Sequence, residues 1–175
     1  MAFSLPADLA TNWADNVGMI ENAAYLNAVG TMGNALKAAM SGMVSNTATA
    51  VVATQETVSG TSYTDLATTT DSVTVTIGAS GIALVIIHAS LYNATNGQIS
   101  YMSFAASGAN TIAASDSQSI SVQIAASAPD GAAYSGIFPL TGLSSSSTTT
   151  FKAKYRATGG TGKFSNRRIT VIPIF

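Results

Sequence analysis

The chain has 175 residues, enough for one domain of ordinary size and a short appendage, and it contains no cysteine for disulfide bonds. Charged residues make up 9 % of it, against about a quarter in a typical soluble domain. A net charge of −1 excludes a general nucleic-acid or membrane-surface footprint. Because a free monomer usually carries more surface charge, we expect much of the surface to be hydroxyl-covered sheet or buried against other copies.

The sequence gives no sign of a membrane span or a secretory signal. Its longest apolar run, at 82–87, is far shorter than the roughly 20 residues that a spanning helix needs. The N-terminal segment has neither a basic flank nor an apolar stretch, so we expect no signal peptide.

The pattern divides the chain into residues 1–45, a leader and a helix, and residues 46–175, a β-domain. We expect the leader to be irregular and its Trp13 to fill a pocket, on this chain or on a partner, or to cap the helix. Asn22 is a suitable N-cap for a helix that ends near Gly42. A small-residue linker is expected at 43–50.

Apolar and small residues in this helix recur at alternating spacings of three and four, as in the seam of a coiled coil. The seam consists of Leu26, Val29, Gly33, Leu36, Met40 and Met43. It is short and carries glycine, which costs up to ~1 kcal/mol relative to alanine, so the helix is not expected to be stable alone. It either joins sister copies or a particle surface, or lies on its own domain. The predicted contact residues are Trp13, Leu26, Val29, Leu36 and Met40.

The rest of the chain has the alternating period of β-strands. Strands are expected at 51–57, 72–77, 82–92, 98–106, 119–125, 132–140 and, as a closing pair, within 148–175. About eight strands with turn signals every ten or so residues predict an antiparallel β-sandwich of jelly-roll type. The apolar run 82–92 is expected to be central and covered on both faces. The NATNG segment at 93–97 predicts a hairpin turn.

The last segment, 148–175, holds six of the seven lysine and arginine residues. Apolar residues at 151, 153 and 155 alternate with basic residues at 152, 154 and 156, which predicts a strand with one basic face. A glycine-rich turn at 159–162 would make this segment a closing hairpin whose final strand has an uncovered edge.

The basic residues of this segment have three interpretations. They form a solvated strand face, they pair with aspartates of upstream turns within or between copies, or they bind an acidic ligand such as a glycan carboxylate. The residues concerned are Lys152, Lys154, Arg156, Arg167 and Arg168. Nucleic acid is disfavoured because aromatic residues do not interleave the basic face.

No motif predicts catalysis, a bound metal or a cofactor. His88 is the sole histidine and lies in mid-strand, and no serine stands in a nucleophile-elbow pattern. The turn aspartates are Asp65, Asp71, Asp116 and Asp130. They are spaced singly, as in local turns, although a glycosidase pair could meet in space. We therefore expect a non-enzymatic protein.

Several blocks of the sequence resemble virion proteins of tailed bacteriophages, especially phages of actinobacteria. SYTDLAT at 62–68, YMSFAASGANTIAASDSQSI at 101–120 and FKAKYRATGGTGKFSNRRITVIPIF at 151–175 are similar to small head-fibre, capsid-decoration or minor tail domains. WADNVGMIENAAYLN at 13–27 is similar to a leader of phage fibre and appendage proteins.

The resemblance implies a virion component with a jelly-roll head, made in the host cytoplasm. It would form trimers and attach through its N-terminus to the major capsid protein or to tail proteins. We expect a capsid-decorating fibre or knob. The alternative is a tail-associated fibre that binds host surface glycan through the loops at 92–97 and the basic hairpin, and a polysaccharide-degrading enzyme is a third class.

Overall fold

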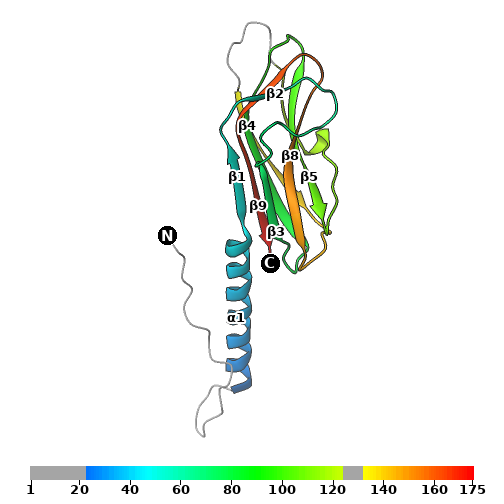
Figure 1. Ribbon diagram of the computed structural model, residues 1–175. Coiled ribbons are helices and arrows are strands. Elements are labelled where there is room, and N and C mark those ends of the chain that lie inside the picture. Colours follow the sequence, from blue (N-terminus) through cyan, green and yellow to red (C-terminus); the bar gives the residue numbers. More distant parts are fainter. Residues whose placement is uncertain (1–22, 124–131) are drawn as a thin grey trace.

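A computed structural model describes residues 23–123 and 132–175. A long helix leads into a sandwich of two antiparallel sheets, and the helix extends beyond one end of the sandwich (Figure 1). The predicted fold class, a mainly β antiparallel sandwich preceded by a helix, is confirmed. The predicted leader, with Trp13 and Asn22, lies outside the described residues.

The described residues contain nine strands in two sheets. Sheet A has the order β1-β9-β4-β7, with β2 pairing β9 beyond β1, and sheet B has the order β3-β8-β5-β6. Apart from β2, consecutive strands alternate between the sheets except at β5 and β6, which is the arrangement of a jelly roll. The strands are β1 (Ala48–Val52), β2 (Glu56–Val58), β3 (Ser72–Thr76), β4 (Ile82–Asn93), β5 (Ile99–Gly108), β6 (Ile120–Gln123), β7 (Ala132–Leu140), β8 (Thr148–Ala157) and β9 (Gly162–Ile174).

Helix α1 (Ala23–Asn46) runs almost directly into β1, with Thr47 between them. The backbone N–H and hydroxyl of Thr47 both donate to the carbonyl of Met43, at 3.1 and 2.8 Å. The predicted helix end near Gly42 and the linker at 43–50 are therefore wrong. Gly42 lies within the helix, and the Phe175 ring packs so closely against it that a Cβ atom would be 2.8 Å from the ring.

Two predicted hairpins are also wrong. The turns at 93–97 and 159–162 join strands of different sheets, because β4 and β9 belong to sheet A whereas β5 and β8 belong to sheet B. The final strand β9 lies between β4 on one side and β1 and β2 on the other, so it has no free edge. Turn residues show that the chain reverses, but they do not show whether the flanking strands pair or stack.

β4 is central in sheet A, as predicted, but the described residues cover only one of its faces. Val85, Ile87 and Leu91 are fully buried between the sheets, whereas Ile82 and Ile86 on the other face are partly exposed. The enclosed core is aromatic at its centre, where the rings of Phe104 and Phe151, for example, lie 6.3 Å apart. Other fully buried core residues are Met102, Ala153, Tyr155, Phe164, Ile169 and Val171.

A β-bulge in β9 decides which of two adjacent arginines points inward. β4 pairs His88 with Arg168 and Ser90 with Ser165, so two residues of β9, 166 and 167, face one residue of β4. Asn166 adopts the left-handed conformation, with φ of 50°. Before the bulge the even-numbered residues of β9 point inward, and after it the odd-numbered residues do. Arg167 therefore enters the interior while Arg168 stays outside.

Candidate interaction surface

The basic side chains of β8 form ion pairs within the chain. Asp65, in the connection between β2 and β3, accepts from the Nζ atoms of Lys152 and Lys154, each at 2.7 Å. Burial alone would raise the pKa of Asp65, but the two lysine hydrogen bonds outweigh burial and lower it. These contacts match the interpretation in which the basic stripe pairs with upstream aspartates. Both partners of each pair belong to the same copy of the chain.

Arg156 is held in the same way, by an acid from the connection between β5 and β6. Its Nε donates to Asp116 at 2.9 Å, its second nitrogen also contacts that carboxylate, and its guanidinium lies 4.0 Å from the centre of the Tyr101 ring. The hydrogen bond from Arg156 lowers the pKa of Asp116. Tyr63 donates to the same carboxylate, and burial followed by this contact raises the pKa of Tyr63 to about 12.

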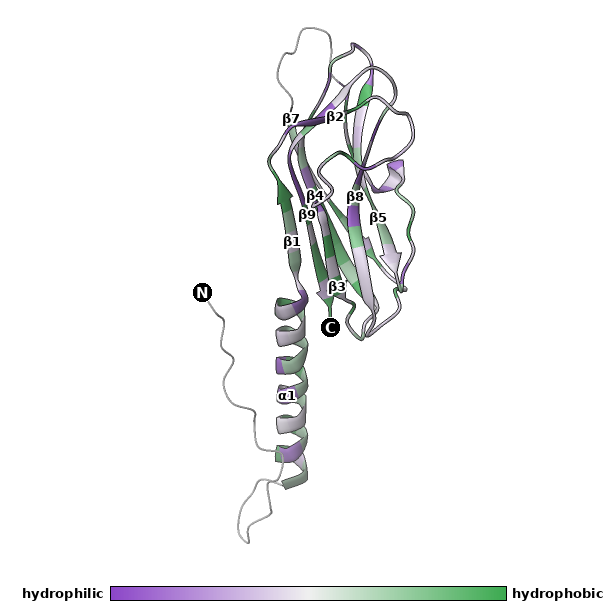
Figure 2. Ribbon diagram, in the orientation of Figure 1, coloured by the Kyte–Doolittle hydropathy of each residue, from purple (hydrophilic) through white to green (hydrophobic). Residues whose placement is uncertain are grey.

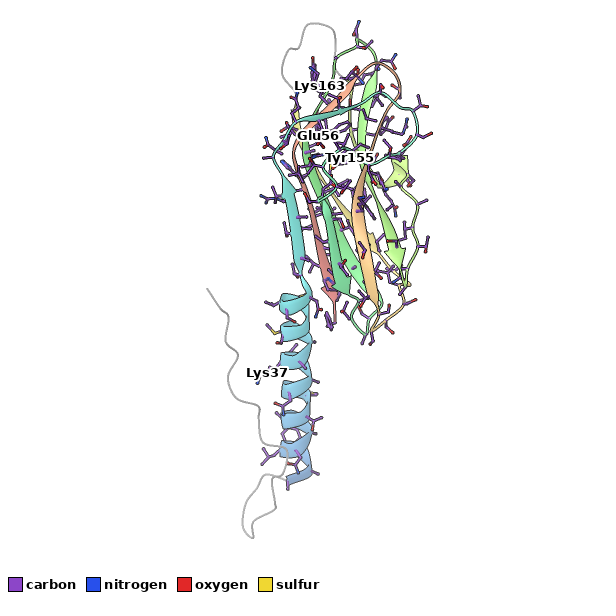
Figure 3. The ribbon with its side chains drawn as sticks, viewed as in Figure 1. Lys37, Glu56, Tyr155 and Lys163 are labelled. Carbon is purple, nitrogen blue, oxygen red and sulfur yellow. The ribbon has the colours of Figure 1, made fainter. Side chains whose placement is uncertain are left out.

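Arg167, predicted as part of a surface basic face, is instead completely buried. Its guanidinium lies 2.7 Å from Glu56 and 3.6 Å from Asp71, and the Tyr155 hydroxyl donates to Asp71 at 2.5 Å. Figure 3 places Glu56 and Tyr155 together in the half of the sandwich away from α1. Arg167 cannot take part in binding a ligand at the surface, and the bulge at Asn166 is the reason.

The carboxylates of this buried cluster shift in opposite directions. Burial would raise the pKa of Glu56, but hydrogen bonds from Thr68 and the charge of Arg167 lower it. Burial raises the pKa of Asp71 and is only partly offset by Tyr155 and Arg167. The cluster is an internal network of buried and partly buried groups, and no spacing in the sequence could connect residues so far apart in the chain.

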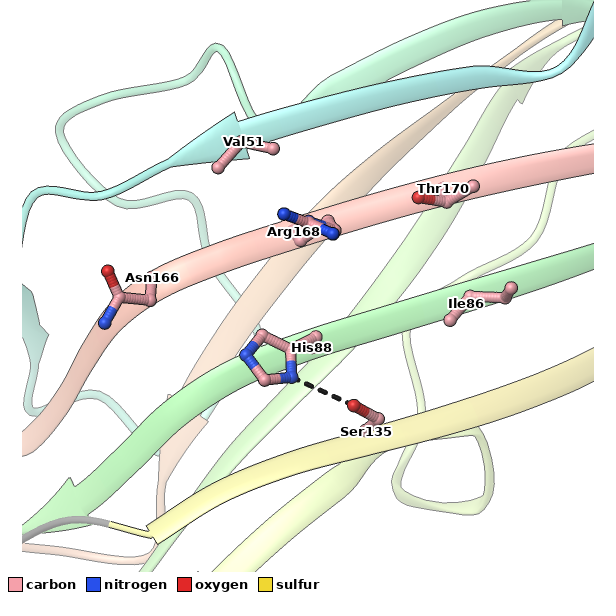
Figure 4. A pocket seen from close by; sticks show the side chains of 7 residues that line it. All are labelled: Val51, Ile86, His88, Ser135, Asn166, Arg168 and Thr170. Carbon is pink, nitrogen blue, oxygen red and sulfur yellow. Dashed lines mark hydrogen bonds between the residues drawn. The ribbon is translucent and has the colours of Figure 1, made fainter.

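Arg168 makes no ion pair within the described part of the chain, and it borders a shallow hollow on the outer face of sheet A (Figure 4). The hollow has a volume of about 560 Å³. His88 and Ser135 share a hydrogen bond of 2.9 Å across it. The lining residues are Val51, Ile86, His88, Ser135, Asn166, Arg168 and Thr170.

Between this hollow and α1 the outer face of sheet A is apolar, unlike that of sheet B. Figure 2 shows the hydrophobic colouring over β1 and over the parts of β4 and β9 nearest the helix. On this face Ile137 is 64 % exposed and Val51 is 55 % exposed. The outward side chains of sheet A nearest the helix include Thr49, Val51, Ile82, Leu84, Ile86, Ile137, Pro139, Thr170, Ile172 and Ile174, and those nearest the other end include Ser90, Tyr92, Lys163 and Ser165. Those of sheet B include Thr74, Tyr101, Ser121, Thr150, Lys152, Lys154 and Arg156.

A second apolar surface runs along α1, and we call it the helix stripe. Its members, with their exposed fractions, are Tyr25 (64 %), Val29 (41 %), Met32 (70 %), Leu36 (63 %), Met40 (42 %) and Val44 (57 %). Of the predicted contact residues, three belong to the stripe, Leu26 is partly buried, and Trp13 lies outside the described residues. The sequence prediction missed Tyr25, Met32 and Val44 because it followed the alternating spacings of three and four of a coiled coil, whereas successive stripe residues are mostly four positions apart.

The described residues contain no group of three or more histidine, cysteine or acidic side chains that could hold a metal. Among the same residues, no helix is both long and apolar enough to cross a membrane. His88 contacts a serine, and no acid in the described part of the chain is hydrogen-bonded to it as a triad would require.

No protein-family model matches the chain, and no curated protein matches it in sequence. Solved structures with a similar arrangement include that of infectious bursal disease virus, Gt strain, with a TM-score of 0.46 and 8 % identity over 73 % of this chain. This chain spans 33 % of that viral chain. Another is the Eiger TNF of S. frugiperda, with a TM-score of 0.43 and 13 % identity over 74 % of this chain and 94 % of that one. Likenesses this distant carry no inference about what the chain binds.

Proposed function

We propose that this protein is a non-enzymatic structural component of a virion, which associates through α1 and displays its β-sandwich. The observation that supports the proposal is the helix stripe. Six large apolar side chains face solvent on a 24-residue helix, most of which extends beyond the sandwich (Figure 1). A helix in that position gains little stability from packing against its own domain. Because most helical stability in proteins comes from packing an apolar face, we expect another copy to cover the stripe.

The low charge of the chain supports the same proposal. With 9 % charged residues, and with most described basic residues already paired internally, the surface has little charge to keep separate copies apart. We propose three copies joined in parallel. The resemblance to phage head-fibre and decoration proteins suggests a capsid-decorating fibre or knob whose N-terminal part attaches to the major capsid protein or to tail proteins.

Light scattering on the purified chain tests this proposal. We expect a trimeric mass for the wild type and a monomeric mass for Leu36→Glu, because a carboxylate cannot be buried unpaired in an apolar seam. Ala38→Glu is the matched control, since this exposed residue lies on the other side of the same helical turn. A monomeric wild type, or an unchanged mass for Leu36→Glu, would contradict the proposal.

A second candidate, a tail-associated fibre that binds host glycan, is favoured by one feature of the sandwich end away from α1. There the Lys163 ammonium lies 4.9 Å from the centre of the Tyr92 ring, and it is not in an ion pair with any described residue (Figure 3). An aromatic ring beside a cation suits an acidic sugar. If this candidate is right, a glycan screen gives acidic hits that Lys163→Gln loses; no hit would leave the structural role alone.

A further inference from the structure

We infer that the outer face of sheet A is a second contact surface between copies of this chain, so that copies associate along the sandwich as well as along α1. This inference rests on the proposed self-association. It assigns the apolar outer face and the hollow beside it to a neighbouring copy.

The contrast between the two outer faces is the first argument. An antiparallel sheet that faces water usually places polar residues on that side. Sheet B follows this rule with threonines, lysines and an arginine, whereas sheet A presents isoleucine, leucine and valine on four adjacent strands. Because both sheets belong to one sandwich, we attribute this difference in polarity to what each outer face contacts in the assembly: solvent for sheet B and a neighbouring copy for sheet A. An apolar patch of this kind marks an interaction site.

The charge of the face restricts its occupant. Within the described chain no carboxylate lies among the outward residues of sheet A; the charged groups there are Arg168 at the hollow and Lys163 at the end away from α1. The part of the face between the hollow and α1 is uncharged and apolar, and the same part of a second copy is an equally uncharged partner. A strongly charged partner would lose solvation there without finding counter-charges.

The stiff connection between α1 and sheet A couples this contact to association through α1. One residue separates α1 from β1, and hydrogen bonds from Thr47 and Asn46 to the last helical turn stiffen the joint. Phe175 lies against Gly42 and fixes the helix to the end of β9. Because α1 runs into β1, an edge strand of sheet A, helices that associate in parallel along α1 bring the β1 edges of neighbouring copies close together, and the outer face of sheet A is then within reach of a second copy (Figure 1).

The sizes of the two surfaces agree with a joint interface. The outer face from Ile82 to His88 is about 20 Å long and, over four strands, about 17 Å wide, roughly 350 Å² in plan. The stripe on α1, from Tyr25 to Val44, is about 28 Å long and about 10 Å wide, roughly 280 Å² in plan. Stable interfaces bury about 800 Å² on each partner, so either surface alone is too small and the two together approach that size.

Two charge substitutions in the full-length protein separate this inference from the proposed function. Ile137→Glu places a carboxylate on the outer face of sheet A, and we expect it to reduce the mass measured by light scattering at micromolar concentration. Thr74→Glu, an exposed residue on the outer face of sheet B, is the control and should leave the mass unchanged. If Leu36→Glu gives monomers while Ile137→Glu keeps the wild-type mass, the inference is overturned and the proposed function stands.

A labelling experiment avoids any doubt about folding of the charged variants. The chain has no cysteine, so Val51→Cys and Thr74→Cys each introduce a single thiol for maleimide labelling. In the assembled protein we expect Val51→Cys to react several-fold more slowly than Thr74→Cys, although Val51 is 55 % exposed in the single chain. Adding Leu36→Glu should remove that difference. Equal labelling rates in the assembled protein would refute the contact.

Discussion

Arg167 carries a positive charge into the interior of the sandwich, between Glu56 and Asp71. Replacing it with methionine would leave two poorly solvated carboxylates without their counter-ion. Breaking a buried ion pair in this way typically costs about 3–5 kcal/mol, so we expect Arg167→Met to lower the free energy of unfolding by that amount. Urea denaturation followed by circular dichroism measures the change.

Lys163→Met provides the comparison for this prediction. It removes a base from the same strand but loses little more than the contact with the Tyr92 ring, worth about 0.5–1 kcal/mol at an exposed site. Similar losses for the two variants would mean that the Arg167 cluster contributes no more to stability than a surface contact does.

The pKa shifts of the carboxylates predict how the free energy of unfolding changes with pH. The pKa values of Glu56, Asp65 and Asp116 are lowered in the folded protein, so these groups stabilise it above their unfolded values near pH 4. That contribution is lost as the pH falls through the folded-state values. Asp71, whose pKa is raised, acts in the opposite direction: its contribution is present at low pH and lost as the pH rises.

We therefore expect the free energy of unfolding to decrease from about pH 5 downward, where ordinary carboxyl groups begin to bind protons. Asp65→Asn should show a shallower decrease, because it removes one of the three stabilising carboxylates and leaves the other two. Urea unfolding at half-unit pH steps gives both slopes. A stability that is constant or increases below pH 4 would show that the pairs with Lys152, Lys154 and Arg156 do not matter energetically.

At the scale of the elements, the turn between β3 and β4 is held against the end of β9. A Cβ atom on Gly78 would lie 2.0 Å from the carbonyl oxygen of Ile174, so backbone would have to move. We expect Gly78→Ala to lower the melting temperature by several degrees, since overpacking typically costs about 1–3 kcal/mol. Calorimetry checks this, with Gly60→Ala as the control because the nearest atom there is 3.9 Å away. Equal melting temperatures for the two variants would contradict the tight contact.

The elements themselves could largely be predicted from the sequence, because alternation reports burial directly. Val73 and Val75 point inward as expected, and β8 alternates buried apolar with outward basic residues. The pairing of strands could not be predicted, since a glycine-rich turn looks the same whether it closes a hairpin or crosses between sheets. The burial of Arg167 could not be predicted either, because the bulge at Asn166 changes which residues of β9 point inward partway along the strand.

At the scale of the whole molecule, the low charge predicts that some surface is buried against other copies, but this prediction does not specify which surface. Low charge and a helical seam at Val29 and Leu36 pointed to α1, and both residues are exposed there. The outer face of sheet A was not identified. The apolar run of β4 predicted cover on both faces, and the described residues cover only one of them.

Methionine oxidation can show the helix stripe inside the intact assembly. Met32 is 70 % exposed in the single chain, whereas Met102 is fully buried in the core. If three copies join along α1, hydrogen peroxide should convert Met32 to its sulfoxide slowly in the wild type and several-fold faster in Leu36→Glu. Met102 should react slowly in both, which controls for unfolding, and peptide mass spectrometry reports each site. Fast oxidation of Met32 in a wild type that still has its oligomeric mass would mean that copies meet elsewhere, and the outer face of sheet A would then be left as the contact to test.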